Sequence, residues 1–197
     1  MTSEQTSGAD GVKIAVLRIG RASLKIYCAA AHWQRYVGIR KNMNQEVITL
    51  RQISVCYYQT KLTSSHNKNF YIIRQHWKEF NTLLQKSKVR LGPNWEKYAI
   101  TQKCNRQYYY QCVFPTTAHI RQFEFMQIPA GNYVKFNHEG PMNTILETIN
   151  EIYKEVIPNS DLNIDINRSL IHFEHYNSKF NWNRPDSIVE IYVPLMT

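Results

Sequence analysis

An internal repeat constrains the fold of this 197-residue chain more than any other feature of its sequence. The segment LRQISVCYYQT, from Leu50, matches FMQIPAGNYVKF, from Phe125, at an offset of 75 positions. WEKY at 95–98 matches FEHY at 173–176 (offset 78), and QCVFP at 111–115 matches EIYVP at 190–194 (offset 79). Three matches in the same order, with slowly drifting offsets, indicate a duplicated structural unit.

Each half also contains one helical pattern between its first and second matched strands. Apolar side chains recur at positions i, i+4, i+7 and i+11, which predicts one buried stripe on each helix. The stripes consist of Ile73, Trp77, Phe80 and Leu84 in the first half, and of Ile145, Ile149, Ile152 and Val156 in the second. Core packing explains most of them, but large rings at a helix flank, Trp77 and Tyr153, could also line a cavity.

These patterns predict an α+β fold in which a strand–helix–strand–strand module occurs twice with pseudo-twofold symmetry. We expect an antiparallel sheet with two packed helices, because a sheet covered by a helix on one face buries that face. The modules span residues 44–116 and 117–197. Residues 1–43 have no counterpart in the second half and form an N-terminal extension. Residues 1–42 hold seven Lys and Arg against two acidic residues, and so contribute +5 of the net charge of +9.

Composition excludes several classes of protein. No apolar run approaches the roughly 20 residues that a membrane-spanning helix needs, and the N-terminus does not resemble a signal peptide. The four cysteines show no zinc-binding spacing, so we expect reduced thiols, no metal, no cofactor and a cytoplasmic protein. The positive charge forms no dense run and no helix-turn-helix pattern accompanies it, which argues against direct binding of nucleic acid.

Two glutamates interrupt otherwise apolar or aromatic strands. Glu190 lies in IVEIYVPL, where period-two alternation places it on the same face as Tyr192. Glu174 lies in FEHY and shares its face with His172 and Tyr176. A carboxylate in such a strand lies either on a solvated face or in a site, because burying it unpaired is costly. If both glutamates face one cleft, repulsion and burial should raise the pKa of at least one of them.

Aromatic residues are abundant, at 13% of the chain. Tyr108 and Tyr110 point to one face of their strand. Phe180 and Trp182 lie in a polar loop, NSKFNWNRPDS, which could cover a cleft beside the acidic strand. Rings and a carboxylate together attract delocalised cations.

The second half resembles the GyrI-like small-molecule-binding domain. The resemblance rests on IPAGNY, on HEGP at the start of the helix, on FEHY and on EIYVP, and it extends more loosely over 47–197. Such domains occur alone and as effector-binding modules of AraC-type and MerR-type multidrug-responsive activators. The resemblance implies a cleft for hydrophobic aromatic or cationic compounds. Its expected ligand-binding residues are Glu174, Glu190, Tyr192, Tyr176, Trp77, Tyr153, Tyr110 and Trp182.

We therefore expect a protein that sequesters or senses lipophilic cations. Two alternatives remain open. Some similar stand-alone proteins hydrolyse cyclopropane-bearing toxins, a reaction for which Glu190 would be the general base and Tyr192 the acid. The chain could instead be an interaction module that modulates a transcription regulator or a nucleic-acid enzyme.

Overall fold

The computed structural model describes residues 43–196; Cys28 and the predicted N-terminal extension, apart from Met43, lie outside this range. The described chain forms eight strands: β1 (Gln45–Leu50), β2 (Ile53–Lys61), β3 (Glu96–Cys104), β4 (Gln107–Pro115), β5 (Glu124–Ile128), β6 (Gly131–Glu139), β7 (Leu170–Asn177) and β8 (Ile188–Pro194). Its helices are α1 (His66–Lys86) and α2 (Ile145–Glu151), the latter flanked by η2 (Met142–Thr144), η3 (Ile152–Val156) and η4 (Ile157–Asn159).

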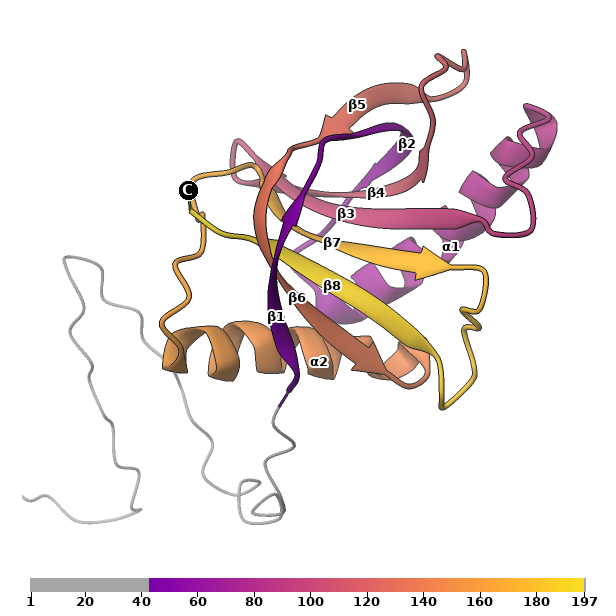
Figure 1. The fold of residues 1–197 in the computed structure, drawn as a ribbon. Coiled ribbons are helices and arrows are strands. Elements are labelled where there is room, and N and C mark those ends of the chain that lie inside the picture. The colour runs from indigo at the N-terminus through magenta and orange to yellow at the C-terminus, as the bar shows by residue number, and fades with distance from the viewer. Residues whose placement is uncertain (1–42, 197) are drawn as a thin grey trace, which may run out of the picture. The chain divides into compact units, whose positions relative to one another are not determined.

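All eight strands belong to one curled antiparallel sheet, in the order β1-β6-β8-β7-β3-β4-β2-β5 (Figure 1). When each strand of the first half is exchanged with its counterpart in the second half (β1 with β5, β2 with β6, β3 with β7 and β4 with β8), the same order results, read from the opposite edge of the sheet. Within each predicted module a short strand precedes the strand–helix–strand–strand elements and pairs with the other module, β1 with β6 and β5 with β2. The predicted α+β architecture is thus confirmed, and the strand order is the one that a duplication would produce.

One predicted correspondence between the halves is wrong. The offset of 75 equated Ile53 with Ile128, but Ile53 begins β2 whereas Ile128 ends β5. These two residues are instead partners across the β2–β5 pair. The offset of 75 therefore does not relate structurally equivalent positions of the two halves.

Both predicted helical stripes pack against the same face of the sheet, which we call the helix face. Phe80 and Leu84 of α1 share a buried cluster with Ile145 and Ile152 of the second helical segment. Ser65 caps α1, since its side chain accepts a hydrogen bond from the Lys68 amide.

Hydrogen bonds from each helix to a strand of its own half fix the position of the two helices. His76 of α1 lies 2.8 Å from the Tyr58 carbonyl in β2, and Thr148 of α2 lies 2.7 Å from His138 in β6.

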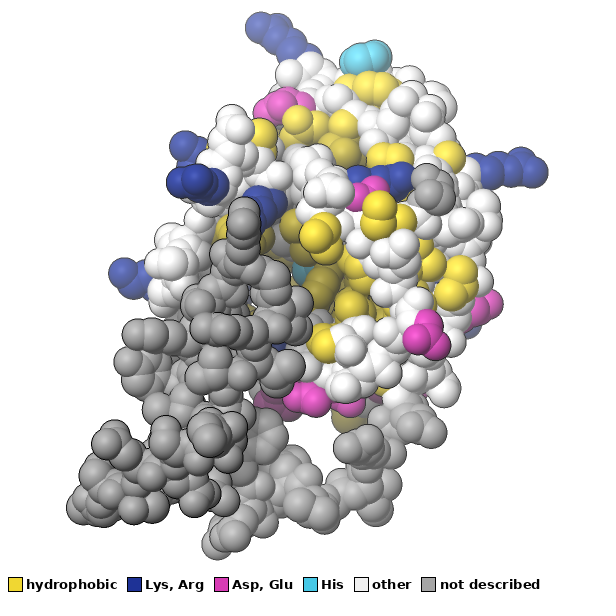
Figure 2. Space-filling model, turned by 90° about the vertical axis from the view of Figure 1, so that its left-hand side faces the viewer, with side chains coloured by type: hydrophobic (Ala, Val, Ile, Leu, Met, Phe, Trp, Pro, Cys, Tyr) yellow, Lys and Arg dark blue, Asp and Glu magenta, His cyan; other side chains and the backbone are white. Residues whose placement is uncertain are grey.

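The opposite face of the sheet, the second face, carries its own buried cluster. Tyr133, Phe173 and Tyr192 belong to it, with Phe173 and Tyr192 stacked at a centroid distance of 4.6 Å. Because each face carries a buried cluster, both faces of the central strands are buried, which explains their almost continuous apolar and aromatic sequence. Figure 2 shows that hydrophobic side chains also reach the surface on one side of the molecule, with Lys and Arg projecting at its margins.

Neither described helix is both long enough and apolar enough to cross a bilayer. Cys56 and Cys112 are buried free thiols and Cys104 is an exposed one. Among the described residues, no three His, Cys, Asp or Glu side chains lie close enough together to hold a metal ion.

Candidate functional site

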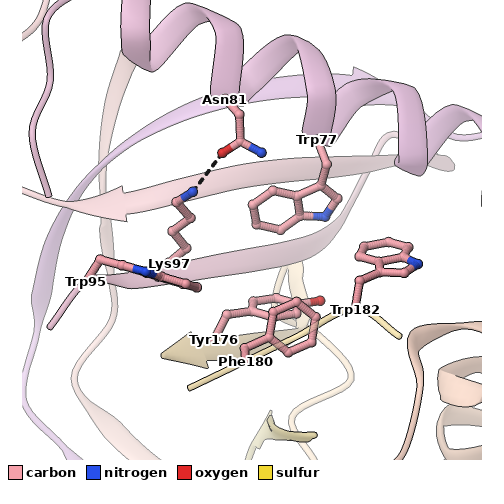
Figure 3. Close-up of a pocket in the computed structure, with 7 residues that line it drawn as sticks. All are labelled: Trp77, Asn81, Trp95, Lys97, Tyr176, Phe180 and Trp182. Carbon is pink, nitrogen blue, oxygen red and sulfur yellow. Dashed lines mark hydrogen bonds between the residues drawn. The ribbon is translucent and has the colours of Figure 1, made fainter. Parts of the chain in front are cut away.

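A cavity of about 190 Å³ opens on the helix face, between α1, the start of β3, the end of β7 and the β7–β8 loop (Figure 3). It is lined by Trp77, Asn81, Trp95, Lys97, Tyr176, Phe180 and Trp182. A larger groove of about 720 Å³ shares Trp77, Asn81 and Trp182 with it and extends along α1 to Phe70. We call the cavity and the groove together the aromatic cleft.

Local structure explains how these side chains converge. Trp77 and Asn81 are one turn apart on α1 and therefore project from the same side of the helix. Trp95 and Lys97 alternate with Glu96, so both point to the helix face. The β7–β8 loop is anchored to η2, since Met142 N–H donates to the Trp182 carbonyl at 3.1 Å.

The aromatic side chains form a continuous row of edge-to-face contacts. Tyr176 lies 5.3 Å from Trp77 and 4.8 Å from Phe180, and Phe180 lies 6.5 Å from Trp182, measured between ring centroids. Such pairs contribute about 0.5–1.5 kcal/mol each beyond the area that they bury. Figure 3 shows the rings of Trp77 and Trp182 on the side of the cavity away from Trp95 and Lys97.

Glu174 lies directly beneath this row and does not itself line the cavity. Its carboxylate accepts hydrogen bonds from the hydroxyls of Tyr176 and Tyr110, the latter at 3.4 Å, and Trp77 Nε1–H donates to Tyr110 at 3.1 Å. Burial raises the pKa of Glu174 to about 7, although both tyrosine hydrogen bonds act in the opposite direction. The carboxyl is therefore divided between its neutral and charged forms near neutral pH.

His172 and Tyr153 complete the buried polar group on this side. Tyr153 lies in the π-helical turn that follows α2, and its hydroxyl is 3.1 Å from His172 Nδ1. His172 Nε2 is 4.0 Å from Glu174. Because burial lowers the pKa of His172 to about 4, the ring is neutral at neutral pH and the pair is not an ion pair.

Glu190 and Tyr192 lie on the second face, on the opposite side of the sheet from Glu174. Glu190 accepts hydrogen bonds from the Tyr192 hydroxyl at 2.7 Å and from His175 Nδ1 at 2.8 Å, and Lys135 Nζ is 3.7 Å away. Burial raises the pKa of Glu190, but these hydrogen bonds and charges outweigh it and the pKa is lowered. Burial and the nearby Glu190 raise the pKa of Tyr192.

The prediction that the two glutamates share one cleft is therefore wrong. The register between β7 and β8 is the cause, since Glu174 is paired with Ile191 and His175 with Glu190. Paired residues share a face and neighbouring residues of one strand do not, so the two carboxylates point to opposite faces. The expected pKa rise occurs at Glu174 and not at Glu190. Glu96, which the repeat equated with Glu174, also lies on the second face, 3.5 Å from His175.

Of the eight predicted ligand-binding residues, the structure places Trp77, Tyr176 and Trp182 in the cavity wall. Glu174, Tyr110 and Tyr153 belong to the buried layer behind it, and Glu190 and Tyr192 are remote from it. The sequence prediction missed Asn81, Trp95 and Lys97. Alternation within WEKY could have revealed the last two, because it places Trp95 and Lys97 on one face and Glu96 on the other.

The GyrI-like small molecule binding domain matches residues 43–196. This chain belongs to that family. The finding confirms the predicted resemblance and identifies the described fold as a small-molecule-binding domain. A search of curated proteins finds no match.

Solved structures share the fold at low sequence identity. SAV2435 bound to tetraphenylphosphonium superimposes with a TM-score of 0.64 at 13% identity, covering 78% of this chain and 94% of that one. A putative transcription regulation protein from Staphylococcus aureus gives 0.60 at 12% identity, covering 79% and 99%. The EcmrR C-terminal domain gives 0.51 at 16% identity, also covering 79% and 99%.

Proposed function

We propose that this GyrI-like domain binds aromatic small molecules in the aromatic cleft, to sense or to sequester them. The observation that carries the proposal is the row of aromatic side chains from Trp77 to Trp182, which lines an open cavity beside a groove on the helix face. A cleft of mostly aromatic side chains with a few polar groups is the usual form of a small-molecule site.

Tetraphenylphosphonium, the ligand of SAV2435, is the first probe to test, because it is both aromatic and bulky. A preference for cations was predicted from the family resemblance, from the aromatic rings and from two carboxylates facing one cleft. Only Glu174 lies on this side, and Tyr110 and Tyr176 separate it from the cavity. The proposal therefore concerns aromatic compounds, and the charge of the ligand is a separate property of the site.

The hydrolase alternative has no geometric support from this cleft. Its predicted base and acid, Glu190 and Tyr192, contact each other on the other face of the sheet. A general base works best with a pKa near the working pH. The pKa of Glu190 is lowered by its partners, which makes it a poor base near neutrality.

The test is calorimetric titration of the full chain with tetraphenylphosphonium and with neutral aromatic compounds. We expect Trp77→Ala and Trp182→Ala each to weaken binding of at least one compound by tenfold or more, or about 1.4 kcal/mol. Tyr71→Ala is the matched control, because Tyr71 is 65% exposed on α1 and outside the cleft. Binding that neither tryptophan affects would place the ligand elsewhere and contradict the proposal.

A further inference from the structure

The wall of the aromatic cleft carries positive charge. Among residues 43–196, Lys97 is the one charged side chain lining the cavity, and the groove adds Arg74 and Lys78. Within the described part of the chain no Asp or Glu lines either space. A cationic ligand entering here would approach like charges, which is unfavourable at short range in a partly desolvated site.

Lys97 is held in place without a carboxylate partner. Its Nζ donates a hydrogen bond to Asn81 Oδ1 at 2.7 Å, and no described Asp or Glu forms an ion pair with it within 4.0 Å. An ammonium group has three N–H donors, so Asn81 alone does not satisfy it. Burial lowers the pKa of Lys97, as expected for a charge that has lost water without gaining a counter-ion.

The Lys97 ammonium group itself makes the contacts with aromatic rings that a cationic ligand would otherwise make. Nζ lies 5.1 Å from the centroid of the Trp95 ring and 5.9 Å from that of Phe80, both within cation–π range. Figure 3 shows Lys97 rising between Trp95 and Asn81, on the opposite side of the cavity from Trp182. A ligand lying against Trp77 and Trp182 would therefore have its far end next to this ammonium group.

Glu174 does not reverse this preference. Its carboxyl is covered by the hydroxyls of Tyr176 and Tyr110, and its pKa is governed by burial and by these two tyrosines. The exposed charge of the cavity is thus the ammonium group.

We propose that Lys97 makes this cleft selective for aromatic compounds that carry an anionic group, such as aryl carboxylates. This inference rests on the proposed function of the cleft and names the class of ligand. The rings of the ligand pack between Trp77 and Trp182, and its carboxylate pairs with the Lys97 ammonium as a charge-assisted hydrogen bond. Asn81, which already holds the ammonium, is the positioning residue of this pair.

The experiment compares three naphthalene derivatives of similar shape and different charge on the full chain. The probes are 2-naphthoate, 2-naphthamide and 2-naphthylmethylammonium, each titrated by calorimetry at one pH near neutrality and one ionic strength. For the wild type we expect 2-naphthoate to bind at least tenfold more tightly than the ammonium compound. Lys97→Met keeps the aliphatic stem and should weaken 2-naphthoate at least tenfold while changing 2-naphthamide less than about threefold.

Two further variants make the result specific. Lys86→Met removes the same charge from an exposed position on α1 and should leave all three affinities unchanged. Lys97→Arg keeps the charge and should retain the preference for 2-naphthoate. Circular dichroism verifies that each variant is folded, and the wild-type series tests the preference even if Lys97→Met does not fold.

The outcomes separate the two proposals. If 2-naphthamide binds but 2-naphthoate has no advantage over the ammonium compound, or Lys97→Met leaves 2-naphthoate binding intact, the inference about Lys97 is wrong and the aromatic cleft stands. If none of the three compounds binds the wild type, and tetraphenylphosphonium does not bind either, the proposed function fails, and the inference fails with it.

Discussion

At the scale of single residues, Glu174 is a carboxyl group buried among aromatic side chains. Both tyrosine hydroxyls around it are donors, so the carboxylate is hydrogen-bonded but has no positive partner. Burial nevertheless raises its pKa to about 7. A carboxyl whose pKa is higher in the folded than in the unfolded state binds its proton more tightly when folded. Its contribution to stability is therefore lost as the pH rises from the unfolded pKa, near 4.5, to about 7.

This sign leads to a prediction for Glu174→Gln. Glutamine keeps the size and one acceptor oxygen but cannot ionise, so the variant avoids the loss of stability that the wild type accumulates as the pH rises from near 4.5 to about 7. Relative to the wild type, we expect its free energy of unfolding to be on the order of 2–3 kcal/mol higher at pH 8 than at pH 5, meaning that the variant is more stable there, at about 1.4 kcal/mol per pKa unit. Urea denaturation at the two pH values measures this difference.

The difference between variant and wild type is the proper measure, because buried histidines act in the opposite direction. Burial lowers the pKa values of His76, His138 and His172, so these residues increase stability as the pH rises through their unfolded value. Glu155→Gln, at an exposed site, is the control and should show no such change. An equal offset at both pH values would mean that Glu174 is already ionised at pH 5.

The sequence predicts which side chains of one strand lie on the same face of the sheet, but not whether side chains of two different strands do. Alternation placed Glu190 with Tyr192, and Glu174 with Tyr176, on common faces, as found. Whether Glu174 and Glu190 share a face depends on the register between β7 and β8, which a hydrophobic pattern buried on both faces does not specify. The pattern does not single out Lys97 either, since a lysine in an alternating strand is usually solvated.

At the scale of elements, the β7–β8 loop determines whether the cleft has a second wall. The loop carries Phe180 and Trp182, and hydrogen bonds hold it both internally and to Gly140 and Met142. Buried Ser187 is central to them: its Oγ accepts from Asn181 N–H at 2.8 Å, and its carbonyl accepts from Gly140 N–H at 2.9 Å. The sequence predicted that the two rings could cover a cleft, but the residue that fixes the loop is an ordinary serine without a recognisable motif.

Ser187→Ala should loosen this loop without unfolding the domain. The change leaves the Asn181 amide without its acceptor, at a cost of about 1 kcal/mol. Because the carbonyl bond to Gly140 remains, we expect affinity for 2-naphthamide, or for whichever aromatic probe binds, to fall roughly three- to tenfold. Ser178→Ala, in the same loop but exposed, should change nothing. Unchanged binding by Ser187→Ala would show that the loop does not contribute a wall.

The helices illustrate another limit of sequence patterns. The stripe from Ile145 to Val156 predicts one continuous helix, and its residues do face the core. The structure instead passes from α2 into a π-helical turn at Ile152–Val156. This widening places Tyr153 next to His172 in the buried layer, and no apolar periodicity signals it.

At the scale of the whole molecule, the sheet joins the two halves more closely than a pair of separate modules would. The centre of the sheet is the β3–β7 pair, and each half gives its first short strand to the other. The repeat predicted the module but not this exchange, because β1 and β5 are short and lie at the ends of the matched segments. Removing either edge strand would expose a strand of the opposite half, so we expect the two halves to fold together.

This arrangement predicts what happens when residues 1–42 are removed. Every strand and helix of the sheet domain lies between Gln45 and Pro194, and Met43 packs against the core cluster of the helix face. A chain of residues 43–197 therefore keeps all of these contacts, and it matches the extent of the family domain. We expect it to fold, with a thermal midpoint within a few degrees of the full chain and the same affinity for 2-naphthamide, a ligand without charge.

Its net charge falls from +9 to +4, since residues 1–42 contribute +5. For 2-naphthoate, any loss of affinity should thus disappear at high salt, because long-range attraction is screened there while the contact with Lys97 remains. Thermal denaturation and calorimetry at low and high salt measure both effects. Failure to fold, or a loss of 2-naphthamide binding, would place part of the working domain before Met43.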